Sequence, residues 1–292
     1  MSRSWLERIY SRRVRESGQP RRGVFQRLEA RRLRIGLAPD GLLVAAYAGR
    51  VRSVLDSAQA VPVSGGALPA WRAAVEALPA ALAPHAPYKP RATVVLSSHF
   101  ARYALLAPDP ALRTAEEWLA YARHRLESVH GHPVAEWELR VTETSRNGAR
   151  LACGVDRALL EAVTARVGES GATLASVQPY LMAAYNRVRA RLGRRSCWLV
   201  IAEPGRLALV LIRGGAWQSI RCRNADEGWR LRLPEILARE TAALALEEPC
   251  TEIVIVTPEA LEADPMDELR ICDLTLPRGA PSAHQSLAMV LP

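Results

Sequence analysis

Two groups of residues in this sequence of 292 residues have side chains that could carry out catalysis or bind a metal. The first is Ser97-Ser98-His99, in which hydroxyl groups stand next to an imidazole base. A nucleophilic serine needs its base within hydrogen-bond reach, yet neighbouring residues of a strand point to opposite faces. The sequence also has no GxSxG nucleophile elbow. We therefore expect Ser97 and Ser98 to satisfy backbone groups rather than to catalyse a reaction.

The second group contains three histidines and two carboxylates that could be drawn as metal ligands: His124, His130, His132, Glu127 and Glu136. Their spacing does not match the HExxH zinc motif. Residues 131–133, Gly-His-Pro, have the composition of a surface turn. The five cysteines are scattered and include no CxxC pair, which favours reduced thiols in the core. The sequence thus predicts no metal site and no disulfide framework.

A hairpin pattern occurs twice in the chain, and the other predicted elements follow each copy in the same order. The apolar runs of Leu33–Gly49 flank a turn at Pro39-Asp40-Gly41, and those of Cys197–Gly215 flank a turn at Glu203-Pro204-Gly205. Strand-forming runs on both sides of a Pro-Gly or Asp-Gly turn predict a β-hairpin. After each hairpin we expect a third strand, a helix, and a β-branched strand, Ala92–Leu96 in the first copy and Thr251–Val256 in the second. This predicts one supersecondary unit used twice.

The first copy contains an additional segment that has no counterpart in the second copy. A strand at about residues 100–106 is followed by Thr114-Ala115-Glu116-Glu117, which has the spacing of a helix capping box. Two further strands are expected around a turn at residues 146–148, then a helix from Asp156, a short strand from Thr173, and a helix over residues 180–192. The predicted domains are therefore a basic N-terminal arm over residues 1–32, a first domain over 33–195 with an insertion at about 97–149, and a second, reduced domain over 196–292.

This order of elements resembles two ribonuclease H-like units joined in the actin-like α/β architecture. Within that superfamily the chain is similar to PilM-type proteins of type IV pilus assembly and to the cytoplasmic domain of GspL-type secretion proteins. The resemblance depends on the duplicated hairpin unit, on the position of the insertion, and on its opening strand, Phe100–Pro108, followed by an acidic helix. It covers roughly residues 33–278.

The resemblance also identifies where a nucleotide would bind, because each hairpin turn of an actin-like ATPase contacts phosphate. Such turns need backbone N–H groups and a carboxylate that binds Mg²⁺. Asp40 and Gly41 fit superficially, but no hydroxyl follows and Pro39 lacks an N–H group. In the second turn, Glu203 and Gly205 flank another proline. We expect both turns to be vestigial, with no cofactor; Mg-ATP bound through Asp40 and Glu203 is the alternative.

The net charge of +9 is concentrated in the N-terminal arm, where eleven arginines and three glutamates of residues 1–34 account for +8. Trp5 lies at helix-compatible spacing from Ile9, with Arg8, Arg12 and Arg13 around them. This pattern is typical of a segment that lies on an anionic membrane or binds an acidic partner. It also fits non-specific nucleic-acid binding, or a solvated arm without a partner.

The favoured interpretation is a non-catalytic cytoplasmic scaffold at the inner membrane, in a type IV pilus or type II secretion-like assembly platform. The start of the chain is too charged for a signal peptide and no apolar run is long enough to span a membrane. The resemblance implies that the first domain binds the cytoplasmic peptide of a bitopic membrane protein beside the insertion. It points to His99, Arg102 and Tyr103 as the partner-binding residues. An ATP-binding ATPase or kinase of the same fold, and a nucleic-acid-binding protein acting through the arm, are the alternative hypotheses; we expect no specific nucleic-acid site.

Overall fold

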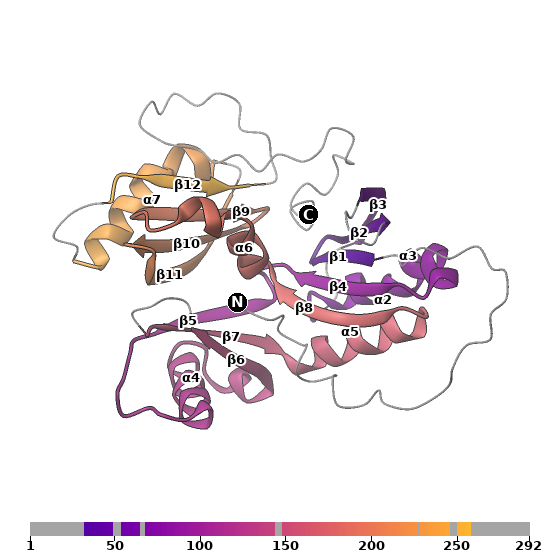
Figure 1. Cartoon of the computed structure of the whole chain (residues 1–292), viewed down its shortest axis with the longest axis horizontal. Helices are drawn as coiled ribbons and strands as arrows, with labels where there is room; N and C mark the ends of the chain where they lie inside the picture. The colour runs from indigo at the N-terminus through magenta and orange to yellow at the C-terminus, as the bar shows by residue number, and fades with distance from the viewer. Residues whose placement is uncertain are drawn as a thin grey trace. The chain divides into compact units, whose positions relative to one another are not determined.

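The computed structural model describes residues 32–48, 54–64, 68–143, 148–226, 228–245 and 250–257. These residues belong to two compact units (Figure 1). The first unit contains the described residues up to Ser97 together with Ala158–Tyr180, and the second contains those of Ser98–Arg157 and those from Leu181 onward. The predicted domain boundary at residue 195 separates the two sequence repeats. The compact units are divided differently, because the insertion and the helix after Tyr180 belong to the same unit as the second repeat.

A five-stranded sheet forms the centre of the first unit, in the order β3-β2-β1-β4-β8. The antiparallel pairs β1–β2 and β2–β3 make the predicted hairpin and third strand, while β4 and β8 add to β1 in parallel. The strands are β1 (Arg32–Ala38), β2 (Gly41–Ala48), β3 (Val54–Pro62), β4 (Arg91–Leu96) and β8 (Thr173–Pro179).

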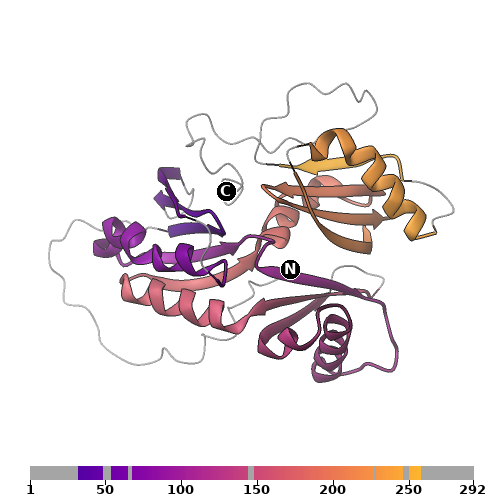
Figure 2. The same cartoon turned by 180° about the vertical axis from the view of Figure 1, so that it is seen from behind.

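The helices of this unit cover the sheet. The helix predicted between the third strand and the strand at Ala92–Leu96 is divided into α2 (Arg72–Glu76) and α3 (Leu78–Leu82), followed by the 3₁₀ helix η1 (Ala83–Tyr88). Pro79 causes the division, because it has no N–H group to continue the hydrogen bonding of α2. At the edge of the sheet formed by β8, α5 (Arg157–Glu169) runs alongside this strand (Figure 1 and Figure 2). It buries one leucine and two valine side chains, spaced four residues apart.

The second unit repeats the same strand arrangement in a four-stranded sheet of order β11-β10-β9-β12. As in the first copy, the first two pairs are antiparallel and the last pair is parallel. Both copies also have a register shift after the sixth residue of the middle strand, at Ala46/Tyr47 and at Leu211/Ile212. The predicted duplication is therefore confirmed down to the position of a β-bulge. The strands are β9 (Cys197–Glu203), β10 (Arg206–Arg213), β11 (Ala216–Asn224) and β12 (Ile253–Val256).

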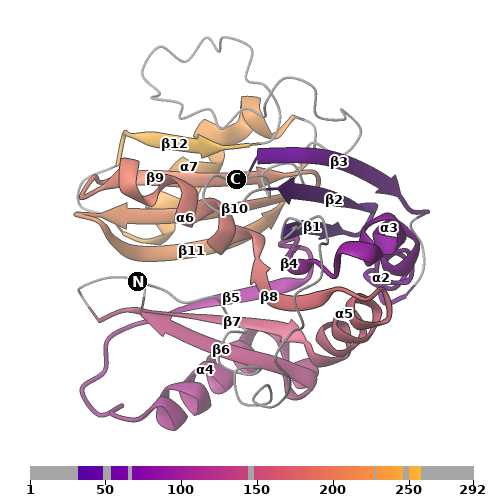
Figure 3. The same ribbon diagram turned by 45° about the vertical axis from the view of Figure 1, so that its right-hand side comes forward.

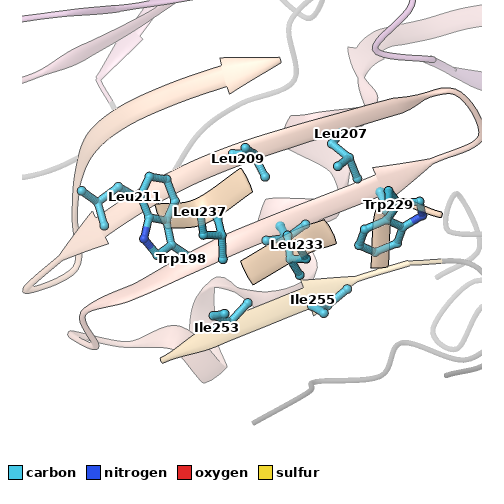
Figure 4. Close-up of a cluster of buried hydrophobic side chains, with 11 residues drawn as sticks. Trp198, Leu207, Leu209, Leu211, Trp229, Leu233, Leu237, Ile253 and Ile255 are labelled. Carbon is cyan, nitrogen blue, oxygen red and sulfur yellow. The ribbon is translucent and has the colours of Figure 1, made fainter. Parts of the chain in front are cut away.

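Both faces of this sheet are covered, which explains why β9 and β10 read as continuous apolar runs. On one face, α7 (Trp229–Ala243) places three apolar side chains at four-residue spacing against alternate residues of the strands (Figure 4). On the other face, Tyr185 of α6 (Tyr180–Leu192) makes an edge-on ring contact with Trp217 at a centroid separation of 4.9 Å. The cluster under α7 consists of Trp198, Val200, Ala202, Leu207, Leu209, Leu211, Trp229, Leu233, Leu237, Ile253 and Ile255.

The insertion forms its own antiparallel sheet of order β5-β7-β6. Its strands are β5 (Ala101–Leu106), β6 (Trp137–Glu143) and β7 (Arg150–Asp156). The helix α4 (Ala115–His130) packs on one face, and it begins with the predicted capping box, since Thr114 Oγ1 accepts from the Glu117 N–H group and Glu117 accepts from that of Thr114. The insertion was predicted to end at about residue 149, but its sheet extends to Asp156, because β7 is the central strand and pairs on both sides.

The insertion sheet is in contact with the sheet of the second repeat. Strand β5, at one edge of the three-stranded sheet, lies beside β11, at the edge of the four-stranded sheet (Figure 3). The residues that open the insertion also contact the turn of the second hairpin, through Ser98 and His99.

Candidate functional site

The second hairpin turn is one of the two turns that were expected to be vestigial phosphate-binding loops. Strand β9 ends at Glu203 and β10 begins at Arg206, so Pro204 and Gly205 form the turn. Gly205 has a φ of +74°, a left-handed conformation that favours glycine. Glu203 and Arg206 are paired across the hairpin, so their side chains leave the sheet on the same face.

The Glu203 carboxylate is buried and accepts a hydrogen bond from the insertion. Its Oε1 atom accepts from the backbone N–H group of Ser98 at 2.8 Å, and Ser98 is only 1% exposed. A charged acceptor makes such a hydrogen bond stronger, and a buried N–H group that has no acceptor lowers the stability of the fold. Glu203 therefore fixes the point where the chain enters the insertion.

His99 lies directly over the turn. Its Nε2 atom is 2.9 Å from the carbonyl oxygen of Pro204, and because a carbonyl can only accept, Nε2 carries the proton. A Cβ atom added at Gly205 would come within 3.3 Å of His99 Cε1. The space above the turn is thus occupied by an imidazole ring, and the carbonyl that faces it is already hydrogen-bonded.

Arg102 continues this contact along β5. Its Nη1 group donates to the carbonyl oxygens of His99 at 2.9 Å and Ala101 at 3.0 Å. Burial lowers the pKa of the Arg102 guanidinium, and the neighbouring Arg206 charge lowers that pKa further. Arg206 donates to the side-chain oxygen of Asn224, so both arginines bond to neutral acceptors. Arg206, which the sequence did not single out, belongs to the same cluster.

The hydroxyl oxygen of Tyr103 is buried, although the residue as a whole is partly exposed. Burial raises the pKa of Tyr103 well above its usual range, and the nearby Cys153, Cys222 and Glu203 raise it further. Of the three residues predicted to bind a partner, His99 contacts the second hairpin turn and Arg102 donates to the His99 carbonyl, and all three side chains, Tyr103 included, are partly exposed.

Two thiols, those of Cys153 and Cys222, lie near Tyr103. Burial raises the pKa of Cys222 to about 11 and raises that of Cys153 further still. A thiol is reactive as the thiolate, so both stay protonated and unreactive near pH 7. Among the described residues, Cys153, Cys197, Cys222 and Cys250 form no disulfide bond, and Cys272 lies outside the described residues.

The first hairpin has its turn within the predicted residues. Ala38 pairs with Gly41, so the turn consists of Pro39 and Asp40, and Gly41 is the first residue of β2. The backbone carbonyl of Asp40 accepts from the Val63 N–H group at 2.9 Å, while its side chain is exposed. This turn is a tight connection between two strands, and Pro39 has no N–H group that could donate to a phosphate.

The remaining candidates are separated by the fold. His124 and His132 are exposed, whereas His130 lies against the Trp137 ring at a centroid distance of 5.3 Å. Burial lowers the pKa of His130, and Arg102 and Arg206 lower it further. In the described part of the chain, no three His, Cys, Asp or Glu side chains are grouped as metal ligands.

The two serines before the insertion, Ser97 and Ser98, each donate a backbone hydrogen bond. The Ser97 N–H group donates to the carbonyl of Leu37, and that of Ser98 donates to Glu203.

The candidate arm residues Trp5, Arg8, Arg12 and Arg13 lie outside the described residues. Among the described helices, none is both long and apolar enough to cross a bilayer.

Two duplicated sheets of this topology, with an insertion after the fourth strand of the first copy, define the actin-like ATPase fold. No protein-family model matches the sequence, and no curated protein matches it in a sequence search. Structural comparison does find similar proteins, at low sequence identity.

Three solved structures share this fold over most of their length. A Bacteroides thetaiotaomicron protein described as having an actin-like ATPase fold and unknown function aligns with a TM-score of 0.55 at 13% identity, over 83% of this chain and 87% of that one. The cytoplasmic domain of EpsL, an inner membrane component of the type II secretion system of Vibrio cholerae, aligns with a TM-score of 0.55 at 15% identity, over 89% and 93%. A chain of the PilM–PilN type IV pilus biogenesis complex aligns with a TM-score of 0.53 at 16% identity, over 79% and 82%. The predicted α/β class and the likeness to PilM-type and GspL-type proteins are confirmed at the level of the fold.

Proposed function

We propose that this protein is a non-catalytic scaffold on the cytoplasmic face of the inner membrane, within a type IV pilus or type II secretion-like assembly platform. In this role it binds the cytoplasmic peptide of a bitopic membrane protein. The fold shared with EpsL and with the PilM–PilN complex supports this setting. Both of those proteins are named for such machines, and the chain covers most of their length.

The observation that carries the non-catalytic part of the proposal is the use of the second hairpin turn. In a nucleotide-binding member of the fold this turn would offer N–H donors to phosphate and a carboxylate to Mg²⁺. Here Glu203 Oε1 accepts from Ser98, and the His99 ring lies over Pro204 and Gly205. The turn therefore holds the insertion in place, and this contact favours the scaffold over an ATPase that uses Asp40 and Glu203.

The insertion offers an edge for a peptide. Among the described strands, β6 pairs only with β7, so its other edge has backbone groups without a strand partner. An extended peptide can add to such an edge as a further strand, with main-chain hydrogen bonds giving affinity. We propose that the partner's peptide adds to β6, with His99 and Arg102 holding the insertion in the orientation that presents it.

Two measurements test this function. Calorimetric titration of the full chain with Mg-ATP is expected to show no binding at millimolar nucleotide. Saturable binding that weakens in Asp40→Ala or Glu203→Ala would instead establish the ATPase or kinase alternative.

The peptide contact is tested with synthetic N-terminal segments of the bitopic membrane proteins encoded by the host's own pilus or secretion platform. One of them is expected to bind in fluorescence polarisation and to slow amide hydrogen exchange in β6 (Trp137–Glu143). Binding that protects another strand and leaves β6 unchanged would move the peptide site elsewhere. Failure of every segment to bind would remove the scaffold proposal.

A further inference from the structure

One end of the second unit concentrates positive charge. Four exposed arginines lie in the last turn of α6 and in the loop after it: Arg189, Arg191, Arg194 and Arg195, which together we name the basic end. From Tyr180 to Ala202 the sequence contains no aspartate or glutamate. The basic end is therefore not an alternating pattern of charges on a solvated helix face.

The loop that carries these arginines is held rigidly against the neighbouring turn. The N–H group of Gly215, in the turn between β10 and β11, donates to the carbonyl of Arg195 at 3.2 Å, and that of Gly214 donates to Ser196 Oγ at 3.0 Å. A Cβ atom at Gly215 would lie 2.9 Å from the carbonyl oxygen of Gly193. The two turns thus fit together closely at the end of the sheet where β9 begins, opposite the end that carries Glu203.

Among the described residues, one arginine of the basic end is paired with a carboxylate. Arg195 forms an ion pair with Glu252 at 3.1 Å, with both side chains partly exposed. In the described parts of the chain, Arg189, Arg191 and Arg194 have no carboxylate within ion-pair distance. Arg189 and Arg191 lie in the last turn of α6, where positive charge is favourable beside the C-terminal end of the helix dipole. This local effect does not account for Arg194 and Arg195, which lie beyond the helix.

We propose that the basic end adsorbs the second unit onto a surface of anionic phospholipid headgroups. Guanidinium groups form paired hydrogen bonds with phosphate, and basic residues gain free energy close to an anionic bilayer. The apolar residues of the same turns, Val188 and Leu192, are buried, so the contact is electrostatic and inserts no apolar side chain. The nearby Trp198 and Trp217 are buried as well, which leaves no aromatic platform for the bases of a single-stranded nucleic acid.

This contact goes beyond the proposed function, because it concerns the bilayer itself and neither ATP nor a partner peptide. It also differs from any membrane contact of the N-terminal arm, because it involves other arginines, on α6 and in the loop after it. Each arginine near an anionic surface changes binding about fivefold, so three of them change it on the order of 100-fold. Such binding is weak alone and strengthens a simultaneous contact with a membrane protein through effective concentration.

The test is co-sedimentation of the full chain with vesicles of phosphatidylglycerol and phosphatidylethanolamine, beside vesicles of phosphatidylcholine. The triple variant Arg189→Gln/Arg191→Gln/Arg194→Gln is expected to bind the anionic vesicles on the order of 100-fold more weakly than the unmodified chain. The control Arg125→Gln/Arg232→Gln/Arg239→Gln removes the same charge from exposed positions on α4 and α7 and is expected to lose at most a few-fold. Lysine at the three positions of the basic end keeps the charge and is expected to bind within about threefold.

Other results would overturn the inference. Equal losses in the two glutamine variants would show that only net charge matters. Unchanged binding in the first variant would assign adsorption to another part of the chain. Binding of polyglutamate but not of anionic vesicles would identify an acidic peptide as the ligand. None of these outcomes bears on the ATP and peptide titrations, so the two proposals fail separately.

Discussion

Replacing Glu203 by alanine removes the acceptor that holds the start of the insertion. The Ser98 N–H group, 1% exposed, would lose its partner at 2.8 Å and stay buried. An unsatisfied buried donor costs about 1–3 kcal/mol, and a bond to a charged acceptor is at the upper end of the range for hydrogen bonds. We therefore expect Glu203→Ala to lower the free energy of unfolding by about 2–3 kcal/mol. Glu203→Gln keeps an oxygen acceptor without the charge, so a loss of about 1 kcal/mol is expected.

Urea unfolding followed by circular dichroism measures these differences, with thermal unfolding as a second readout. For a unit of this size, each kcal/mol corresponds to a shift in Tm of about 2–4 °C. The matched control is Glu235→Ala, which removes an exposed carboxylate from α7 in the same unit and is expected to change stability by less than about 0.5 kcal/mol.

The order of stabilities decides the argument. If Glu203→Ala unfolds at the same urea concentration as Glu235→Ala, the bond to Ser98 does not stabilise the protein. The interpretation of the turn as a contact for the insertion would then be refuted. If the alanine variant is destabilised but the glutamine variant is not, the acceptor matters and the charge does not.

Three further predictions concern packing and protonation. Gly215→Ala should destabilise by about 2 kcal/mol or more, because φ is +82° and its Cβ would meet a backbone carbonyl at 2.9 Å; Gly214→Ala, at φ +58° in open space, should cost about 1 kcal/mol in urea unfolding. Gly154→Ala should cost about 1–3 kcal/mol, because its Cβ would lie 2.7 Å from the Trp137 ring, and a double mutant with Trp137→Leu should lose less than the sum of the two single losses. Burial and nearby arginines lower the pKa of His130 in the folded protein, so as the pH falls the unfolded chain protonates this histidine before the folded protein does. The free energy of unfolding should therefore fall as the pH drops from about 6.5, the usual pKa of histidine, towards the lower pKa in the folded protein. The decrease should be smaller in His130→Gln. Equal pH dependence in that variant and in the unmodified chain would refute the assignment.

Local features of the fold could be predicted because their causes are local in sequence. The two hairpins follow from apolar runs on both sides of a turn, and the capping box from a threonine and a glutamate three residues apart. The repeat could be recognised because each copy must bury the same two central strands. The helix after Trp71 was predicted without its break, although Pro79, the cause, was visible in the sequence.

The site itself could be predicted only in part. His99 and Arg102 were selected by their place at the start of the insertion, and Glu203 by its place in the second turn, yet nothing in the sequence joins them. They lie about a hundred positions apart and meet only because β5 lies beside β11. The hydroxyl oxygen of Tyr103, the third residue that the resemblance pointed to for partner binding, is buried, which its place in the sequence did not indicate.

The sequence by itself determined the duplicated strand order and the turn chemistry, because side-chain period, proline and glycine act within a few residues. Only the tertiary structure decided what the second turn contacts, that the insertion belongs with the second repeat, and that the arginines after α6 gather beside the turn between β10 and β11. Those relations depend on contacts between segments distant along the chain. Such contacts leave no periodic signal in one sequence, because each partner satisfies its own local pattern whether or not the other is present.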